Sequence, residues 1–94
     1  LRADPENPKI YLDFGMLYDE TGEYAEAIRF YQQAINLNPD YSLAYRNMGN
    51  TYTRMKEYDK AIESYKKAIE IDPNYEGAKK ALSYVYSLVG KQPQ

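Results

Sequence analysis

The chain has 94 residues, of which 44% are hydrophobic and 28% charged, and this is the composition of one small folded domain. Its formal charge of -2 gives no attraction to phosphate backbones, so we predict no nucleic-acid partner. The absence of cysteine and histidine excludes disulfides and thiol nucleophiles and removes the commonest acid/base side chain and most zinc sites. No run of roughly 18 apolar residues is present, so we predict no membrane-spanning segment and no membrane partner.

A period of 34 residues organises most of the sequence. Residues 8–41 and 42–75 carry the same residue types at equivalent positions. The repeated pairs are Tyr11 and Tyr45, Gly15 and Gly49, Tyr18 and Tyr52, Tyr24 and Tyr58, Ala27 and Ala61, Ile28 and Ile62, Tyr31 and Tyr65, Ala34 and Ala68, Ile35 and Ile69, and Pro39 and Pro73. Asp4-Pro5 aligns with Asn38-Pro39 at the same offset, so we assign residues 1–7 to the tail of a preceding repeat or to a linker.

Each repeat is expected to form two helices. Apolar residues recur every three or four positions along two segments of each unit, which predicts two amphipathic helices. Only Thr21-Gly22-Glu23 separates the two segments of the first unit, so we predict an antiparallel hairpin. Gly15 and Gly49 fall inside the first helices, where glycine costs roughly 1 kcal/mol relative to alanine. We therefore expect a neighbouring helix to approach closely at these two positions.

The chain ends with one more predicted helix at residues 76–90 and a tail at 91–94. This helix is apolar on more than one side. We expect Leu82 and Tyr86 to cover the preceding repeat. The other large apolar side chains would then face the place of a further repeat, and they are Val85, Leu88 and Val89. Such a face indicates either a continuing array or self-association.

The two units resemble the tetratricopeptide repeat (TPR), whose 34-residue pattern contains a large residue, Leu-Gly, Tyr, Ala, an aromatic residue, Ala and Pro. The first unit fills this pattern in order with Tyr11, Phe14-Gly15, Tyr18, Ala27, Tyr31, Ala34 and Pro39. The resemblance implies an all-α fold, an α-solenoid of antiparallel helix hairpins in a right-handed superhelix. It divides the chain into a first repeat at 8–41, a second at 42–75 and a C-terminal capping helix at 76–90, which is the first helix of a further repeat.

The resemblance also implies a non-catalytic scaffold that binds a peptide segment of a partner protein on its concave side, without a cofactor or a metal. The implied peptide-groove residues are Lys9, Leu12, Met16, Leu43, Arg46, Asn47, Asn50, Arg54, Lys80 and Tyr84. Asp19 and Glu20 also fall at groove positions. Because the set mixes apolar, basic and acidic side chains, we expect a ligand with an acidic group near a hydrophobic anchor.

Some members of the family hold the C-terminal carboxylate of a partner with basic and asparagine side chains on successive first helices. Arg46 and Asn50 have the spacing of such a clamp. However, Leu12 and Met16 stand where a lysine and an asparagine are needed. The sequence therefore disfavours this carboxylate clamp.

The sequence is also compatible with functions other than groove binding. Asn47 and Asn50 occupy positions where asparagine is frequent in repeats that share no ligand, and Lys9 and Lys80 fit a solvated helix face. The chain would then be a spacer in a larger array or a module for self-association through the last helix.

Catalysis has little support in the sequence. Asp19, Glu20 and Glu23 form an acidic cluster, but helix ends and turns commonly carry such charges. We predict that the chain is not an enzyme and expect a cytoplasmic location.

Overall fold

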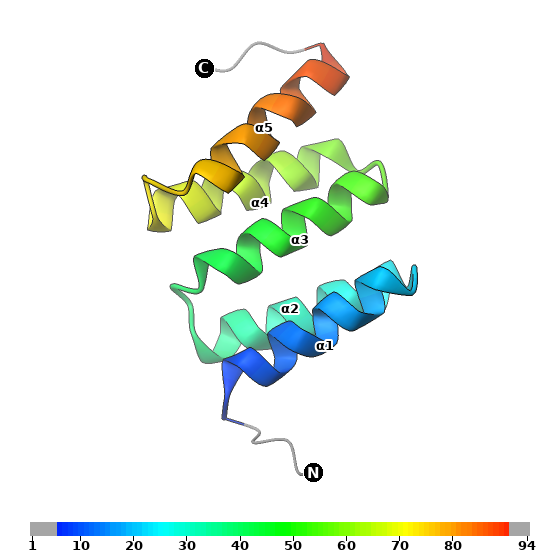
Figure 1. Cartoon of the computed structure of the whole chain (residues 1–94), viewed down its shortest axis with the longest axis vertical. Helices are drawn as coiled ribbons and strands as arrows, with labels where there is room; N and C mark the ends of the chain where they lie inside the picture. The colour runs from blue at the N-terminus through cyan, green and yellow to red at the C-terminus, as the bar shows by residue number, and fades with distance from the viewer. Residues whose placement is uncertain (1–5, 91–94) are drawn as a thin grey trace.

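The computed structural model describes residues 6–90, so the predicted tail at 91–94 and most of the predicted N-terminal tail lie outside the described residues. The helices of this part of the chain are α1 (Pro8–Glu20), α2 (Tyr24–Leu37), α3 (Ser42–Arg54), α4 (Tyr58–Ile71) and α5 (Glu76–Val89). α1 and α2 form one antiparallel hairpin, α3 and α4 form a second, and α5 packs on the second hairpin (Figure 1). The predicted all-α fold of stacked helix hairpins is confirmed.

Short polar side chains define where several of these helices begin and end. The side chain of Asn7 accepts a hydrogen bond of 3.0 Å from the backbone N–H of Lys9, and Pro8 occupies the first helical position. α2 and α4 end at Asn38 and Asp72, which have extended backbones. Each of these two side chains accepts a hydrogen bond of 3.2 Å from the backbone N–H two residues later. The resulting turn starts the next helix within a few residues.

Glycine and tyrosine form the contact within each hairpin. A Cβ atom on Gly15 would lie 2.5 Å from Cε1 of Tyr31, and a Cβ atom on Gly49 would lie 2.6 Å from Cε1 of Tyr65. The predicted close approach at the glycines is confirmed, and the group that approaches is a tyrosine ring. Both rings are at most 2% exposed. Each hairpin therefore closes because a helical glycine leaves room for an aromatic ring of the next helix.

Val85 does not lie on the open face of α5, contrary to the prediction from sequence. It is completely buried and belongs to one core cluster with Ala61 and Tyr65 of α4. The 34-residue period gives the physical reason, since Val85 is equivalent to Thr51 of α3, which is also completely buried. Both first helices turn this position toward the preceding hairpin, so the position packs whether or not another repeat follows.

The outer face of α5 is consequently smaller than predicted. Val89 is half-buried and lies beside the turn between α3 and α4. Leu88 and Tyr84 stay exposed, at 44% and 58%. Leu82 is half-buried and packs against the core cluster that contains Ala61 and Tyr65, so the prediction that it covers the preceding repeat is confirmed. Tyr86 is buried as well.

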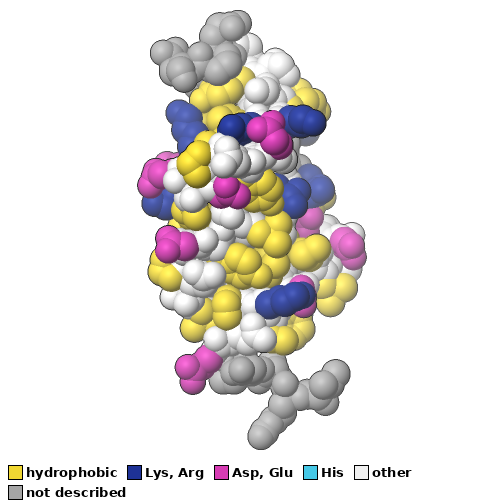
Figure 2. Space-filling model, turned by 60° about the vertical axis from the view of Figure 1, so that its left-hand side comes forward, with side chains coloured by type: hydrophobic (Ala, Val, Ile, Leu, Met, Phe, Trp, Pro, Cys, Tyr) yellow, Lys and Arg dark blue, Asp and Glu magenta, His cyan; other side chains and the backbone are white. Residues whose placement is uncertain are grey.

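The surface mixes residue types along the stack. On the face seen in Figure 2, hydrophobic side chains form several separate patches with charged side chains between them. No helix among residues 6–90 has the length and apolar character that crossing a bilayer requires.

Candidate functional site

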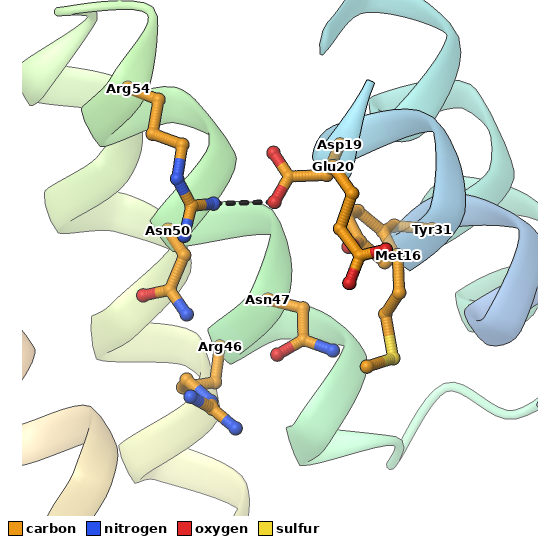
Figure 3. Close-up of a pocket in the computed structure, with 8 residues that line it drawn as sticks. All are labelled: Met16, Asp19, Glu20, Tyr31, Arg46, Asn47, Asn50 and Arg54. Atoms are coloured by element: carbon orange, nitrogen blue, oxygen red, sulfur yellow. Dashed lines mark hydrogen bonds and ion pairs between the residues drawn. The ribbon is translucent and has the colours of Figure 1, made fainter. Parts of the chain in front are cut away.

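A hollow of about 250 Å³ opens between α1 and α3. Its floor and walls come from α1, from one tyrosine of α2 and from successive turns of α3 (Figure 3). The residues that line it are Met16, Asp19, Glu20, Tyr31, Arg46, Asn47, Asn50 and Arg54. Residues of two consecutive repeats thus form one site, and the stacking of the hairpins brings them together.

Half of the predicted groove residues line this hollow. They are Met16, Arg46, Asn47, Asn50 and Arg54. Lys9 is exposed and pairs with Asp13 through a salt bridge of 3.3 Å within α1. Leu43 is half-buried against the core, whereas Lys80 and Tyr84 are exposed on α5. These four residues lie outside the lining.

Leu12 is not a groove residue, and its assignment from sequence is wrong. Its side chain is 3% exposed and belongs to the core cluster that includes Ala27, Ala44 and Met48. The equivalent residue in the second repeat is Arg46, which is half-buried. A leucine at this position stays within the junction of the hairpins, whereas an arginine at the same position extends its charged end to the surface.

Asn47 and Asn50 supply amide groups to the middle of the hollow (Figure 3). Oδ1 of Asn50 accepts a hydrogen bond of 2.6 Å from the hydroxyl of Tyr65, which fixes the amide and leaves its Nδ2 group as a donor. Asn47 is 8% exposed, and its side chain points into the hollow. A side-chain amide has one donor and one acceptor group, so it can pair with a peptide bond of an extended chain.

Arg46 is held in place by an aromatic ring at the start of α5. Its Nε donates a hydrogen bond of 3.1 Å to the hydroxyl of Tyr75, and its guanidinium carbon lies 5.8 Å from the centre of the same ring. Both contacts involve an uncharged partner. The positive charge of Arg46 is therefore oriented without being neutralised, and its terminal N–H groups are available to a carboxylate.

Arg54, by contrast, has an acidic partner. Its terminal nitrogen lies 2.5 Å from Oδ2 of Asp19, and Oδ1 of the same carboxylate accepts a hydrogen bond of 2.9 Å from the hydroxyl of Thr51. The Asp19 side chain is only 13% exposed. The two arginines that line the hollow thus differ in the charge that is left for a ligand.

Tyr31, the aromatic residue of the first repeat pattern, lies in the core, and the structure places it at the edge of the hollow as well. The residue is 1% exposed. Burial and the negative charge of Asp19 raise the pKa of Tyr31 to about 12. Burial likewise raises the pKa of Tyr65. No signal in the sequence separates a buried tyrosine whose hydroxyl reaches a groove from one whose hydroxyl does not.

The acidic cluster of the sequence does not form one constellation. Asp19 pairs with Arg54, whereas a carboxylate oxygen of Glu23 accepts a hydrogen bond of 2.9 Å from the hydroxyl of Thr21 in the turn after α1. Asp19 and Glu20 line the hollow and Glu23 does not. Glu23 is therefore separate from the two carboxylates at the hollow.

Two family models match the sequence, one described as tetratricopeptide repeat over residues 42–75 and one described as TPR repeat over residues 15–56. No curated protein shows significant sequence similarity to the chain.

Similar solved structures include two crystal structures of MamA. Each is 36% identical in sequence and matches 93% of this chain, with TM-scores of 0.88 and 0.87. The matches cover 51% and 48% of the MamA chains, so this chain spans about half their length. A third structure is the first TPR of Spaghetti (RPAP3) bound to the HSP90 peptide SRMEEVD. It is 25% identical, has a TM-score of 0.87, and the match covers 95% of this chain and 71% of that one.

Proposed function

Because this chain belongs to the tetratricopeptide repeat family, we propose that it is a non-catalytic interaction module that binds an extended peptide segment of a partner protein in the hollow between α1 and α3. The proposal fits the family, whose members are typically non-catalytic, and it fits the peptide seen on the TPR of RPAP3. It requires no cofactor.

One arrangement carries the proposal, namely two amides and an oriented cation in one hollow. Asn47 and Asn50 can pair with the main chain of an extended peptide, which gives affinity without reading its side chains. Arg46 adjoins them, restrained by Tyr75. Since the restraint exists before binding, less side-chain entropy is lost when a ligand carboxylate arrives.

The side chains around the amides suggest the ligand chemistry. Met16 is 45% exposed at the rim and offers an adaptable apolar contact. An acidic side chain would meet Arg46. We therefore expect a ligand in which an apolar residue lies close to an acidic one. The burial of Leu12 and the presence of Met16 leave α1 without the basic and amide groups that a C-terminal carboxylate clamp needs, so SRMEEVD itself is expected to bind weakly.

The proposal is tested by selection from a random-peptide display library on the domain and on the double variant Arg46→Ala/Asn50→Ala. We expect an enriched motif with an acidic residue near an apolar one, and we expect the double variant to lose it. The matched control is Arg29→Ala/Asn36→Ala, which removes the same residue types from exposed positions on the outer face of α2. Enrichment that survives in the groove variant, or no enrichment at all, would contradict the proposal.

Self-association through α5 is the alternative, and the side chains that support it are now fewer. The exposed apolar side chains of this helix are Tyr84 and Leu88, because Val85 is buried and Val89 half-buried. Two exposed side chains one helical turn apart form a smaller patch than the three-residue face expected from sequence. The groove is therefore the better-supported site.

A further inference from the structure

Asp19 joins the two repeats at the edge of the hollow. Its carboxylate is held by Arg54 at 2.5 Å and by the hydroxyl of Thr51 at 2.9 Å, and both partners lie on α3 whereas Asp19 lies on α1. Salt bridges such as Lys9–Asp13 connect neighbours on one helix instead. The contact of Asp19 thus crosses between consecutive first helices, within the surface that we propose as the binding site.

The 34-residue period indicates that this contact is particular to one junction. The equivalent junction between α3 and α5 has apolar residues at the positions of Thr51 and Arg54, namely Val85 and Leu88. At the position of Asp19 it has Thr53, whose hydroxyl donates a hydrogen bond of 2.9 Å to the carbonyl of Gly49 in the same helix. All three positions of the contact are therefore different at the other junction. The stacking of hairpins does not itself require this carboxylate.

The carboxylate changes what the hollow can bind. Arg46 and Arg54 lie on the same helix, about 12 Å apart for eight residues at 1.5 Å each, with Asn47 and Asn50 between them. Asp19 gives Arg54 an internal carboxylate, so a ligand carboxylate would have to displace it or meet its negative charge. Arg46 is bound by the uncharged hydroxyl of Tyr75. The two ends of the hollow are consequently unequal toward an anion.

We propose, on the basis of the proposed peptide-binding function, that Asp19 is a specificity-determining residue that withholds Arg54 from the ligand and confines recognition of acidic side chains to Arg46. The domain then selects peptides with one acidic position at the Arg46 end of the motif. A peptide with a second acidic residue several positions away meets the carboxylate of Asp19 in place of an available cation.

The test repeats the display selection with Asp19→Asn, which keeps the shape of the side chain and an acceptor for Thr51 but removes the charge. We expect the motif of the unmodified domain to gain a second acidic position. A synthetic peptide of the new motif should bind the variant about tenfold more tightly than the unmodified domain, as measured by fluorescence anisotropy. Adding Arg54→Gln to the variant should abolish the second position.

Two further variants separate the outcomes. Asp13→Asn removes a carboxylate from an exposed part of α1 outside the hollow and should leave the motif unchanged. Asp19→Thr introduces the residue type found at the equivalent position of the next repeat, Thr53. It replaces Asp19→Asn in the selection if that variant does not fold. Identical motifs for the unmodified domain and the folded Asp19 variant would overturn the role of Asp19 while leaving peptide binding intact. Absence of any motif in both would overturn the proposed function and this inference with it.

Discussion

At the scale of single residues, the chemistry of the groove depends on which partner each polar side chain has inside the molecule. Arg46 and Arg54 have the same side chain on the same helix, yet one contacts a neutral tyrosine and the other a carboxylate. Asn50 is likewise fixed by the hydroxyl of Tyr65. The residue types around the hollow are therefore a poor guide to binding unless these internal contacts are known.

Tyr31 leads to a prediction about alkaline pH. Its pKa is raised from about 10 in the unfolded chain to about 12 in the folded one, so its contribution to stability is complete below pH 10 and is lost as the pH rises from 10 to 12. We expect the free energy of unfolding to fall by up to about 3 kcal/mol over this range because of Tyr31. Tyr31→Phe keeps the buried ring and removes the titration.

Urea unfolding followed by circular dichroism at several values between pH 8 and pH 12 measures this effect. The unmodified domain should lose more stability than Tyr31→Phe, because only the unmodified domain contains the hydroxyl of Tyr31. Tyr65, whose pKa is also raised, titrates in both proteins and contributes equally to both losses. Equal losses in the two proteins would show that the buried hydroxyl of Tyr31 is not the group responsible.

At the scale of helices and hairpins, small residues matter as much as large ones. Ala27, Ala34, Ala61 and Ala68 are completely buried, and Gly15 and Gly49 each lie under a tyrosine ring. The hairpins close over these positions because there is no larger side chain to hold the helices apart. The glycines inside the predicted helices were sufficient to predict a close approach of the next helix, whereas the tyrosine ring as the approaching group is a finding of the structure.

Gly49→Ala tests the hairpin contact. In an exposed helix this substitution stabilises by roughly 1 kcal/mol, but here the added Cβ would lie 2.6 Å from the ring of Tyr65. We expect a net destabilisation of about 1 to 3 kcal/mol in urea unfolding. Gly77→Ala is the matched control, since its nearest side-chain atom is 3.4 Å away, and it should be neutral or stabilising. A stabilised Gly49→Ala protein would refute the packing argument.

At the scale of the whole molecule, the stack is a row of nearest-neighbour contacts. α5 packs mainly on α4, and α3 connects the two hairpins. Each first helix presents the same positions to the preceding hairpin, as Thr51 and Val85 demonstrate. Stability is then set by each hairpin and by each junction, which makes the last helix a cover for the core of the second repeat.

Val85→Lys and Leu88→Lys form a matched pair that tests this role of α5. Val85→Lys buries a charge against α4 and should destabilise by roughly 3 kcal/mol or more in urea unfolding, whereas Leu88→Lys changes an exposed position and should stay within about 0.5 kcal/mol. A Val85→Lys protein as stable as the unmodified domain would contradict the burial.

Light scattering over a range of protein concentrations tests self-association through α5, and it uses the Leu88→Lys variant of this pair. If α5 mediates self-association, Leu88→Lys should dissociate the oligomer while the fold persists. A monomer before and after this substitution would exclude self-association through the outer face of the helix.

The sequence by itself was enough to establish the helices, their pairing into hairpins and the close approach of the helices at the glycines. These features depend on residues near one another in the chain, such as Gly15 and Tyr31. Each feature occurs in both 34-residue repeats, so the sequence contains its pattern twice. Proline after Asn38 and Asp72 fixed where the second helices end. Local spacing and turn chemistry determine such features before any long-range packing is known.

Only the tertiary structure decided which apolar or charged side chains remain available at the surface. Helical periodicity shows that Leu12 and Val85 lie on particular sides of their helices, but it does not show that a neighbouring hairpin covers those sides. The pairing of Asp19 with Arg54 also depends on how two hairpins stack, since the residues are 35 positions apart. Availability to a ligand is a property of the packed arrangement, because burial and charge neutralisation both come from neighbours that are distant in the chain.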